Sequence, residues 1–370
     1  MTEKKVKIIA SATVTPCGDD TDSALDNFFR GEQCLTIPKH FDSKGLQLGV
    51  CGELDEAPRS EVSRAEKLLM KLLPQMPYIG SLPSDTTLYL ATTVGSIDLL
   101  EYARTGATLD CTKSLLETAA NIFKLKNVRL VSAACASGQK AAVMAAEMLK
   151  KGKSKYALII GCDISSEFVT SGFFSLGALS KGLTRPYDIA RDGLSLGEAA
   201  GAMLLAAEDT PESPEGYLLG WGETCDATHI TAPDNSGNEL VNAIHHALKM
   251  SKLTANEICG VMGHGTGTIY NDQAEIIALN IIFNDKPCPL YSLKGNIGHT
   301  LGATGVLQNI FALKFVKRQM FPPQAGLIAP MAGAENMVST ASAELNGVNI
   351  LSLNIGFGGL NSAVVLEGVS

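Results

Sequence analysis

The chain has 370 residues, of which 45% are hydrophobic and 6% aromatic, and its formal net charge is −8. A domain usually has about 100–200 residues, so this length predicts two domains or two fused halves around more than one core. The acidic balance disfavours nucleic acid as a general partner, because phosphate binding needs a basic surface.

The first 210 residues alternate short apolar runs with helical patterns. The charged start runs directly into a strand pattern without the apolar stretch and cleavage site of a signal peptide. No apolar run approaches the roughly 20 residues that a membrane helix needs, so we expect a cytoplasmic protein with no membrane insertion. We expect strands at residues 5–11, 87–93, 128–132, 157–161 and 200–206, and helices at 23–30, 63–73, 115–125 and 138–150.

A segment rich in proline, glycine and charge, residues 208–216, is the clearest break in the chain, and the alternation then begins again. We expect strands at residues 217–222, 258–263, 290–292, 348–353 and 362–367, and helices at 238–250, 272–283 and 303–317. Strands separated by helices predict the α/β class, with sheets covered on both faces. We therefore expect two similar halves, 1–210 and 211–370, each with a mixed, mainly parallel sheet, in α-β-α-β-α layers.

One of the nine cysteines stands out. The nine are an odd number without a CxxC pair, which argues against a disulfide framework and a zinc ribbon and favours buried thiols. Cys135, however, follows an apolar strand and precedes a helix, within Ala134-Cys135-Ala136-Ser137-Gly138. A strand-to-helix turn of small residues exposes the thiol to the free N–H groups of a helix start. We therefore expect Cys135 to be a nucleophile.

Two histidines occupy comparable places. His264 ends a strand and is followed by Gly265-Thr266-Gly267-Thr268, and His299 lies between a strand and a helix. Open α/β sheets place their sites at such carboxyl ends, so we expect both imidazoles to meet Cys135. The other four histidines have no metal-ligand spacing, and we expect no metal site. His229 lies in a loop whose hydroxyls are candidates to line a tunnel.

These segments, together with Arg185-Pro186-Tyr187-Asp188, Gly197-Glu198-Ala199-Ala200-Gly201 and the closing Asn354-Ile355-Gly356-Phe357-Gly358-Gly359, fall in one order along the chain. In that order they resemble the β-ketoacyl-acyl carrier protein synthases of the elongating type. The chain is shorter than is usual for that family between residues 80 and 131, which indicates a divergent, short member.

The resemblance implies a thiolase-like fold, a homodimer or heterodimer, and decarboxylative Claisen condensation with malonyl groups on an acyl carrier protein. It implies no metal or redox cofactor, because the phosphopantetheine arm comes with the carrier. In this interpretation Cys135 is acylated and His264 and His299 assist decarboxylation. The resemblance further implies site roles for Lys294 and Glu275, an oxyanion and gating role for Phe357, and substrate contacts for Thr266, Thr268, Gly358, His229 and Thr231.

Carrier docking is assigned to a basic stretch. Arg59, Arg64 and Lys67 have helical spacing in an otherwise acidic chain, and a carrier protein is acidic. The alternative interpretation is an ordinary solvated helix face.

Three rival functions share parts of this pattern. An initiating synthase has asparagine as its third group, and a thiolase has a second cysteine near its C-terminus; His299 and the lack of cysteine after Cys288 speak against them. A catalytically silent partner subunit that sets chain length is the remaining alternative. Such subunits commonly lack the nucleophile, which Cys135 supplies here.

Overall fold

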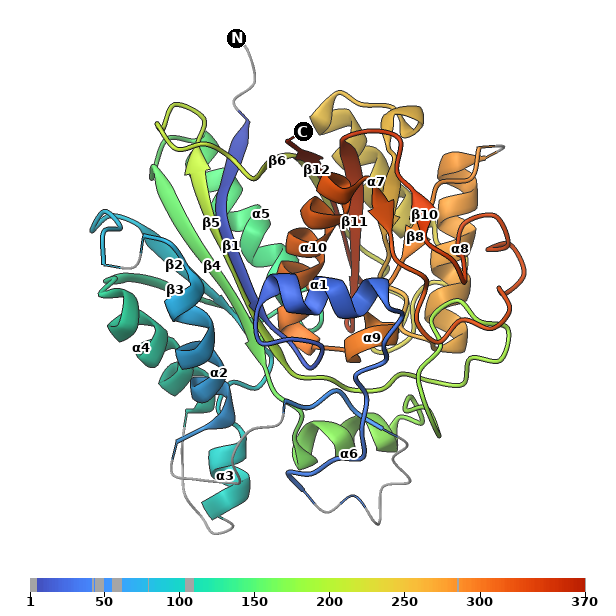
Figure 1. Cartoon of the computed structure of the whole chain (residues 1–370), viewed down its shortest axis with the longest axis horizontal. Helices are drawn as coiled ribbons and strands as arrows, with labels where there is room; N and C mark the ends of the chain where they lie inside the picture. The colour runs from blue at the N-terminus through green and yellow to red at the C-terminus, as the bar shows by residue number, and fades with distance from the viewer. Residues whose placement is uncertain are drawn as a thin grey trace.

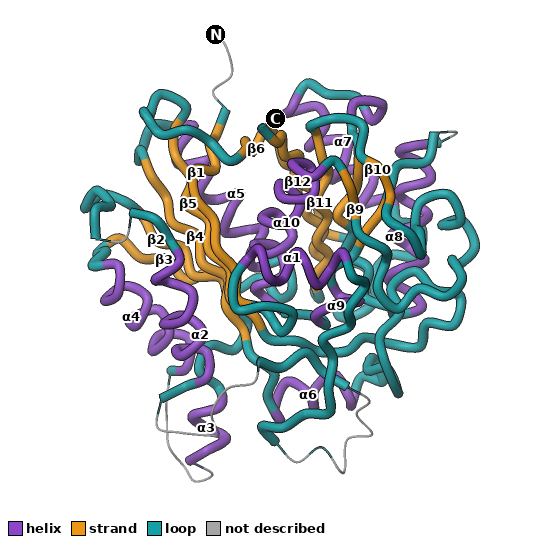
Figure 2. The backbone as a smooth tube through the Cα atoms, in the orientation of Figure 1, coloured by secondary structure: helices purple, strands orange, loops and turns teal. Residues whose placement is uncertain are grey.

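The apolar runs of the sequence form one mixed sheet of ten strands in a computed structural model (Figures 1 and 2). The structure describes residues 5–41, 43, 50–54, 62–78, 80–103, 110–284 and 286–369. The strands are β1 (Val6–Val14), β2 (Thr87–Ala91), β3 (Asn127–Val131), β4 (Tyr156–Asp163), β5 (Ala199–Ala207), β6 (Gly216–Cys225), β7 (Gly260–Met262), β8 (Leu290–Tyr291), β11 (Asn349–Gly356) and β12 (Leu360–Gly368). β9 (Met320–Phe321) and β10 (Ala343–Glu344) form a separate small pair.

The two halves of the chain repeat one strand arrangement. The sheet runs β3-β2-β4-β5-β1-β6-β12-β11-β7-β8, so each half has its strands in the same order when read from its outer edge inward. The outer pairs are parallel and the inner pairs antiparallel in both halves. The expectation of an α/β chain with two similar halves is therefore confirmed in the topology.

The halves are joined more closely than the sequence suggests. β1 and β6 pair antiparallel, from Val6 opposite Leu218 to Ile8 opposite Gly216, so the two expected sheets are one continuous sheet. Both strands start their half of the chain, and each would otherwise leave its N–H and C=O groups unpaired at a sheet edge.

Ten helices occur in the described chain, and five of them form three layers with the two halves of the sheet between them. They are α1 (Thr21–Phe29), α2 (Arg64–Leu72), α3 (Asp98–Ala103), α4 (Cys111–Phe123), α5 (Ser137–Lys150), α6 (Glu167–Ser175), α7 (Asn238–Ser251), α8 (Ile269–Phe283), α9 (Lys294–Ile297) and α10 (Thr304–Arg318). α5 and α10 contact each other and strands of both halves, while α2 and α4 cover one outer face and α7 the other (Figure 1). This gives the expected α-β-α-β-α order.

The central layer requires small residues where its two helices start. A Cβ on Gly138 of α5 would lie 2.8 Å from the carbonyl oxygen of Gly302 and 2.8 Å from the nitrogen of Val306. α10 is buried almost all round, as expected for a helix inside the core. The starts of α5 and α10 are therefore pressed together, backbone against backbone.

One cysteine pair departs from the expectation. Cys17 and Cys34 form a disulfide across a separation of 17 residues, because α1 between them returns the chain to its starting point. The expectation of buried thiols does not hold for this pair. Of the free cysteines, Cys225 is exposed and the others, Cys135 among them, are buried.

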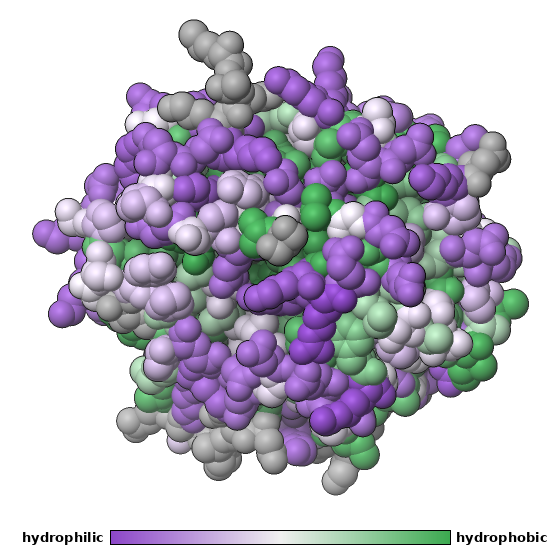
Figure 3. Space-filling model, turned by 45° about the horizontal axis from the view of Figure 1, so that its top comes forward, coloured by the Kyte–Doolittle hydropathy of each residue, from purple (hydrophilic) through white to green (hydrophobic). Residues whose placement is uncertain are grey.

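One face of the molecule shows how polar and apolar residues are distributed on it. The face shown in Figure 3 is mostly hydrophilic, with apolar residues scattered between polar ones. Within the described ranges, no helix combines the length and apolar composition that crossing a bilayer requires.

Candidate active site

Cys135 sits on a tight turn between β3 and α5, as predicted. The preceding residue, Ala134, has a φ of 48°, in the left-handed region that is uncommon for a residue with a Cβ. Ser137 holds this turn: its hydroxyl donates to the carbonyl of Ala134 at 2.6 Å and accepts the N–H of Ala133 at 2.8 Å. The turn places the thiol at the start of the buried helix α5.

The environment of the thiol is mixed. Burial raises the pKa of Cys135 to about 11, while Lys294 and the backbone N–H groups of Phe357 and Cys135 act to lower it. The thiol is therefore mostly protonated at neutral pH. The same two backbone N–H groups are placed to stabilise negative charge on an atom bound to the sulfur.

His264 follows β7 and is fixed by its backbone. Its N–H donates to Glu275 at 2.6 Å, and the next N–H, of Gly265, donates to the same carboxylate at 2.8 Å. Tyr187 donates its hydroxyl to Glu275 at 3.0 Å. Glu275 lies beneath the loop and outside the cavity that opens at Cys135, so it is a positioning residue.

Lys294 lies on the other side of the His264 ring. Its ammonium is 3.3 Å from Nδ1 of His264 and also bonds the His264 carbonyl oxygen. Burial lowers the pKa of Lys294 to about 8, with Glu275 opposing that shift. An ammonium donates hydrogen bonds and cannot accept them, so Nδ1 of His264 must be the acceptor. The proton of this imidazole is therefore on Nε2.

His299 reaches the same tautomer by another route. Its Nδ1 accepts the backbone N–H of Leu301 at 3.2 Å and lies 3.2 Å from the hydroxyl of Thr304. Because a backbone N–H must donate, Nδ1 has no proton and Nε2 carries it.

The two imidazoles stand together as neutral donors. The rings of His264 and His299 have centroids 5.5 Å apart and are nearly perpendicular, at 88°. Burial, with a further contribution from Lys294, holds the pKa of each well below its usual value. Both rings therefore offer an uncharged Nε2–H, the form that stabilises an oxyanion without a prior proton transfer.

Two cavities meet at Cys135. The first, of about 310 Å³, is lined by Cys135, both imidazoles, Thr266 and Thr268, with Thr231 at its wall. The second, of about 680 Å³, is lined mainly by apolar residues from α6 and by Thr93 and Val94. The sulfur is thus open both to a space with hydroxyl groups and to an apolar space.

An aromatic residue that the sequence did not identify stands between these cavities. The ring centroid of Phe173, on α6, lies 5.5 Å from that of Phe357 and 6.5 Å from that of His299. Both phenylalanines line both cavities. The run of aromatic and small residues in α6 is the only signal of it in the sequence.

Two of the expected substrate residues lie outside the lining of the first cavity. His229 is exposed and does not line the first cavity; its Nδ1 instead accepts the N–H groups of Thr231 and Ala232 at 3.1 and 3.0 Å. Gly358 also lies outside the lining, because its N–H is turned to the carbonyl of Ile230.

The docking assignment fails for one of its residues. Arg64 is buried, at 4% exposure, and its guanidinium pairs with Glu198 and donates to the carbonyl of Ser165, so it is not a docking residue. Lys67 is partly exposed, and Arg59 lies outside the described residues.

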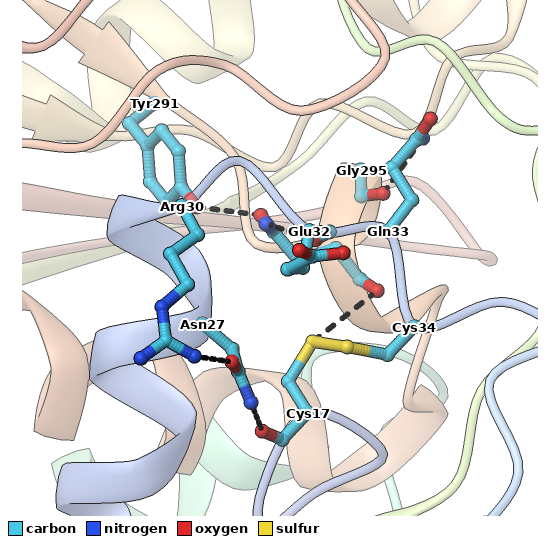
Figure 4. The surroundings of a disulfide bond; sticks show 9 residues. Cys17, Asn27, Arg30, Glu32, Gln33, Cys34, Tyr291 and Gly295 are labelled. Carbon is cyan, nitrogen blue, oxygen red and sulfur yellow. Dashed lines mark hydrogen bonds between the residues drawn. A yellow bond between two sulfur atoms is a disulfide. The ribbon is translucent and has the colours of Figure 1, made fainter.

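The helix that carries Lys294 is supported by the disulfide-linked segment (Figure 4). The N–H of Cys34 donates to the carbonyl of Asn296 at 2.8 Å, and the amide of Gln33 donates to that of Gly295 at 2.9 Å. Asn296 returns a hydrogen bond to the carbonyl of Glu32 at 2.8 Å. The segment from Cys17 to Cys34 therefore holds α9 from outside the site. No cluster of metal-ligating side chains occurs among the described residues.

Comparison with known proteins gives two family matches. The model described as beta-ketoacyl synthase, N-terminal domain, matches residues 127–210, and the model described as beta-ketoacyl synthase, C-terminal domain, matches residues 216–327. The two segments together make up more than half of the chain.

Individual relatives agree with these matches. A 3-oxoacyl-[acyl-carrier-protein] synthase 2 of Mycobacterium leprae is 32% identical over 53% of this chain and 49% of its own length. One of Vibrio harveyi is 23% identical over the whole of both chains. The matched parts span 49% to 64% of the first four curated relatives.

Solved structures show the same fold. The ishigamide ketosynthase/chain length factor covers this chain fully, with a TM-score of 0.89 and 21% identity. The ketosynthase ApeO in complex with its chain length factor ApeC, from Xenorhabdus doucetiae, covers 99% of this chain and 98% of its own, with a TM-score of 0.85 and 25% identity. The thiolase-like fold expected from the sequence is confirmed.

Proposed function

The chain belongs to the beta-ketoacyl synthase family, and from this premise we propose that it is a 3-oxoacyl-[acyl-carrier-protein] synthase. It joins an acyl group held on Cys135 to a malonyl group held on an acyl carrier protein, with loss of carbon dioxide. The observation that carries this proposal is the meeting of one thiol and two neutral imidazole donors at the junction of two cavities.

The first step is acyl transfer to the sulfur. The Cys135 sulfur attacks the thioester carbonyl of an acyl-carrier, and the pantetheine sulfur leaves with a proton. Negative charge on the carbonyl oxygen is stabilised by the backbone N–H groups of Phe357 and Cys135, which face the sulfur. The apolar second cavity receives the acyl chain.

The second step is decarboxylation. A malonyl-carrier enters through the first cavity, where Thr266 and Thr268 offer hydroxyls to its pantetheine arm. Loss of carbon dioxide leaves an enolate whose oxygen accepts hydrogen bonds from Nε2–H of His264 and His299. Each such donor typically lowers the barrier by about 3 kcal/mol.

The last step forms the new bond. The enolate carbon attacks the acyl carbonyl on Cys135, and the sulfur leaves as a thiolate that Lys294, the nearby cation, stabilises. The product is a β-ketoacyl group on the carrier. No step calls for a metal or a redox cofactor, since the pantetheine arm is part of the substrate.

The partners follow from the same proposal. The reaction needs an acyl carrier protein, and we propose the cytoplasm as its location. A second ketosynthase-like subunit, the same chain or a related one, docks along β3. This strand ends the sheet and pairs only with β2 within the described residues, and Leu130 on it is 40% exposed.

A catalytically silent partner subunit is the second candidate, because two similar structures are ketosynthases associated with chain length factors. The complete set of Cys135, His264, His299 and Lys294 favours the enzyme. The test is to incubate the purified chain with acyl-carrier and malonyl-carrier and to measure carbon dioxide and intact carrier mass. A β-ketoacyl mass and acylated Cys135 support the enzyme; unmodified Cys135 and no product, with activity appearing only on a second subunit, support the silent partner.

A further inference from the structure

The last residue of β4, Asp163, is a buried carboxylate to which the proposed mechanism gives no role. Its side chain is fully buried. Oδ1 accepts the hydroxyl of Thr92 at 2.6 Å and the backbone N–H groups of Thr93 and Val94 at 3.0 and 3.3 Å. Oδ2 accepts the N–H and hydroxyl of Thr93 at 2.9 and 3.0 Å and the N–H of Gly302 at 2.7 Å.

These bonds replace a counter-ion. No ion pair to Asp163 occurs in the described part of the chain, and burial raises its pKa to about 6 against the opposing effect of its hydrogen bonds. The hydrogen bonds from these donors favour the ionised form of the carboxyl group. A buried anion without a cation is costly, so its network of N–H donors must be well formed to hold it.

One of those donors leads directly to a catalytic imidazole. Gly302 follows Leu301, whose N–H donates to Nδ1 of His299 at 3.2 Å. Leu301 has a φ of 50°, a conformation that surrounding contacts must hold in place. A Cβ on Gly302 would lie 2.7 Å from Oδ2 of Asp163, so the carboxylate lies directly against this turn.

The other donors lead to the second cavity. Thr93 and Val94 line it together with Cys135 and Leu301. The charge of Asp163 also raises the pKa of Cys135, so the carboxylate works against ionisation of the nucleophile. Asp163 therefore does not activate the thiol. Its hydrogen bonds instead fix the positions of the loop after β2 and the turn after His299.

We propose that Asp163 is a positioning residue for decarboxylation: its carboxylate joins the loop after β2 to the turn after His299, and so holds the Leu301 N–H on Nδ1 and keeps the proton of His299 on Nε2. The inference rests on the proposed function, since it assigns Asp163 to one step of that reaction.

The decisive variant is Asp163→Asn. An amide has a donor where one of the two oxygens now accepts N–H groups, so one side of the network must break. We expect kcat for decarboxylation of malonyl-carrier to fall about 10- to 100-fold, the cost of a misplaced catalytic group, while KM for the carrier stays the same. Loss of the negative charge should also shift alkylation of Cys135 to lower pH, which a damaged fold would not do.

A spectroscopic measurement reports on His299 directly. In protein labelled with ¹⁵N-histidine, the wild type should show an unprotonated Nδ1 and a protonated Nε2 for this residue, and Asp163→Asn should show mixed tautomers. Thr92→Val is the graded comparison, because it removes one donor to Oδ1 but leaves Oδ2 and Gly302 untouched; its decarboxylation rate should fall less than that of Asp163→Asn, and its His299 should keep the proton on Nε2.

Several outcomes separate the two proposals. A wild type without decarboxylase activity contradicts the proposed function, while the tautomer and alkylation measurements still test Asp163. An active wild type whose Asp163→Asn variant keeps its kcat and its His299 tautomer overturns the inference alone. If that variant does not fold, Thr93→Val decides, because it removes a donor to the same oxygen as Gly302; an unchanged kcat there also overturns the inference.

Discussion

Replacing His299 separates the two chemical steps of the proposed reaction. The ring presents Nε2–H because Leu301 and Thr304 hold Nδ1, and its pKa is lowered by burial and by Lys294, so it is a neutral donor. His299→Ala removes one of two such donors from the enolate oxygen. A single donor of this kind is worth about 100- to 1,000-fold in kcat, and we expect decarboxylation to slow by that factor.

Acyl transfer should respond much less to the same change. The largest influences on the pKa of Cys135 are burial, Lys294, Asp163 and the backbone N–H groups of Phe357 and Cys135 itself. The acyl oxyanion likewise relies on the backbone donors. We therefore expect acylation of Cys135 by acyl-carrier to change by less than about tenfold, since no hydrogen bond to the sulfur is lost.

The assay measures the two steps on the same preparation. Acylation is followed by intact protein mass after rapid quenching, and decarboxylation by carbon dioxide release from malonyl-carrier without an acyl group. His299→Asn is the matched variant, because the shorter asparagine side chain retains an N–H donor. Its decarboxylation rate should lie between those of the wild type and His299→Ala. If acylation is lost as completely as decarboxylation, His299 acts as a base toward the thiol and the donor assignment is refuted.

Three further predictions concern the thiol, the disulfide and the carrier. With its pKa at about 11, Cys135 should be alkylated nearly tenfold faster for each pH unit from 6 to 8. Above pH 8 the rate of alkylation should rise less steeply, because Lys294 loses the charge that favours the thiolate. A plateau in the rate below pH 8 would contradict this. Cys17→Ser removes the disulfide to Cys34, which closes a loop with a sequence separation of 17, and should lower the free energy of unfolding by about 3 kcal/mol. Equal urea midpoints for the variant and the wild type would contradict this. Lys67→Glu should raise KM for the carrier and weaken its dependence on salt, because Lys67 is the partly exposed member of the basic stretch; unchanged values would place docking elsewhere.

The turn around Cys135 shows how far local sequence can lead. Expected strand 128–132 and helix 138–150 correspond to β3 and α5, and the small residues between them form the tight turn that was expected. His264 likewise follows strand β7, whereas His299 follows the short helix α9 that comes after β8. Strand, turn and helix are local properties, so apolar period and turn residues are enough to place Cys135 and His264 after the carboxyl ends of strands, while the helix α9 before His299 was not expected.

Arg64 shows where that reasoning stops. The helical pattern was correct, since α2 spans Arg64–Leu72, but helical spacing does not say which face packs inward. Arg64 shares the buried face with Ala65 and Leu68, and its partner Glu198 lies 134 residues away. The pairing of Cys17 with Cys34 and the packing of Phe173 against His299 are of the same kind: each depends on a contact between distant segments, which no local pattern encodes.

The repeated topology explains why the site needs both halves. Cys135 lies in the connection from β3 to α5, and His299 in the connection from β8 to α10, which are equivalent places in the two strand orders. Because the starts of α5 and α10 press together at Gly138 and Gly302, these equivalent connections face each other across the central layer. One contributes the thiol that carries the acyl group, and the other contributes a donor for the enolate oxygen. A chain cut at the predicted boundary near residue 210 would therefore leave Cys135 without either imidazole. We expect neither half alone to decarboxylate malonyl-carrier, because packing of α5 on α10 is what assembles the site.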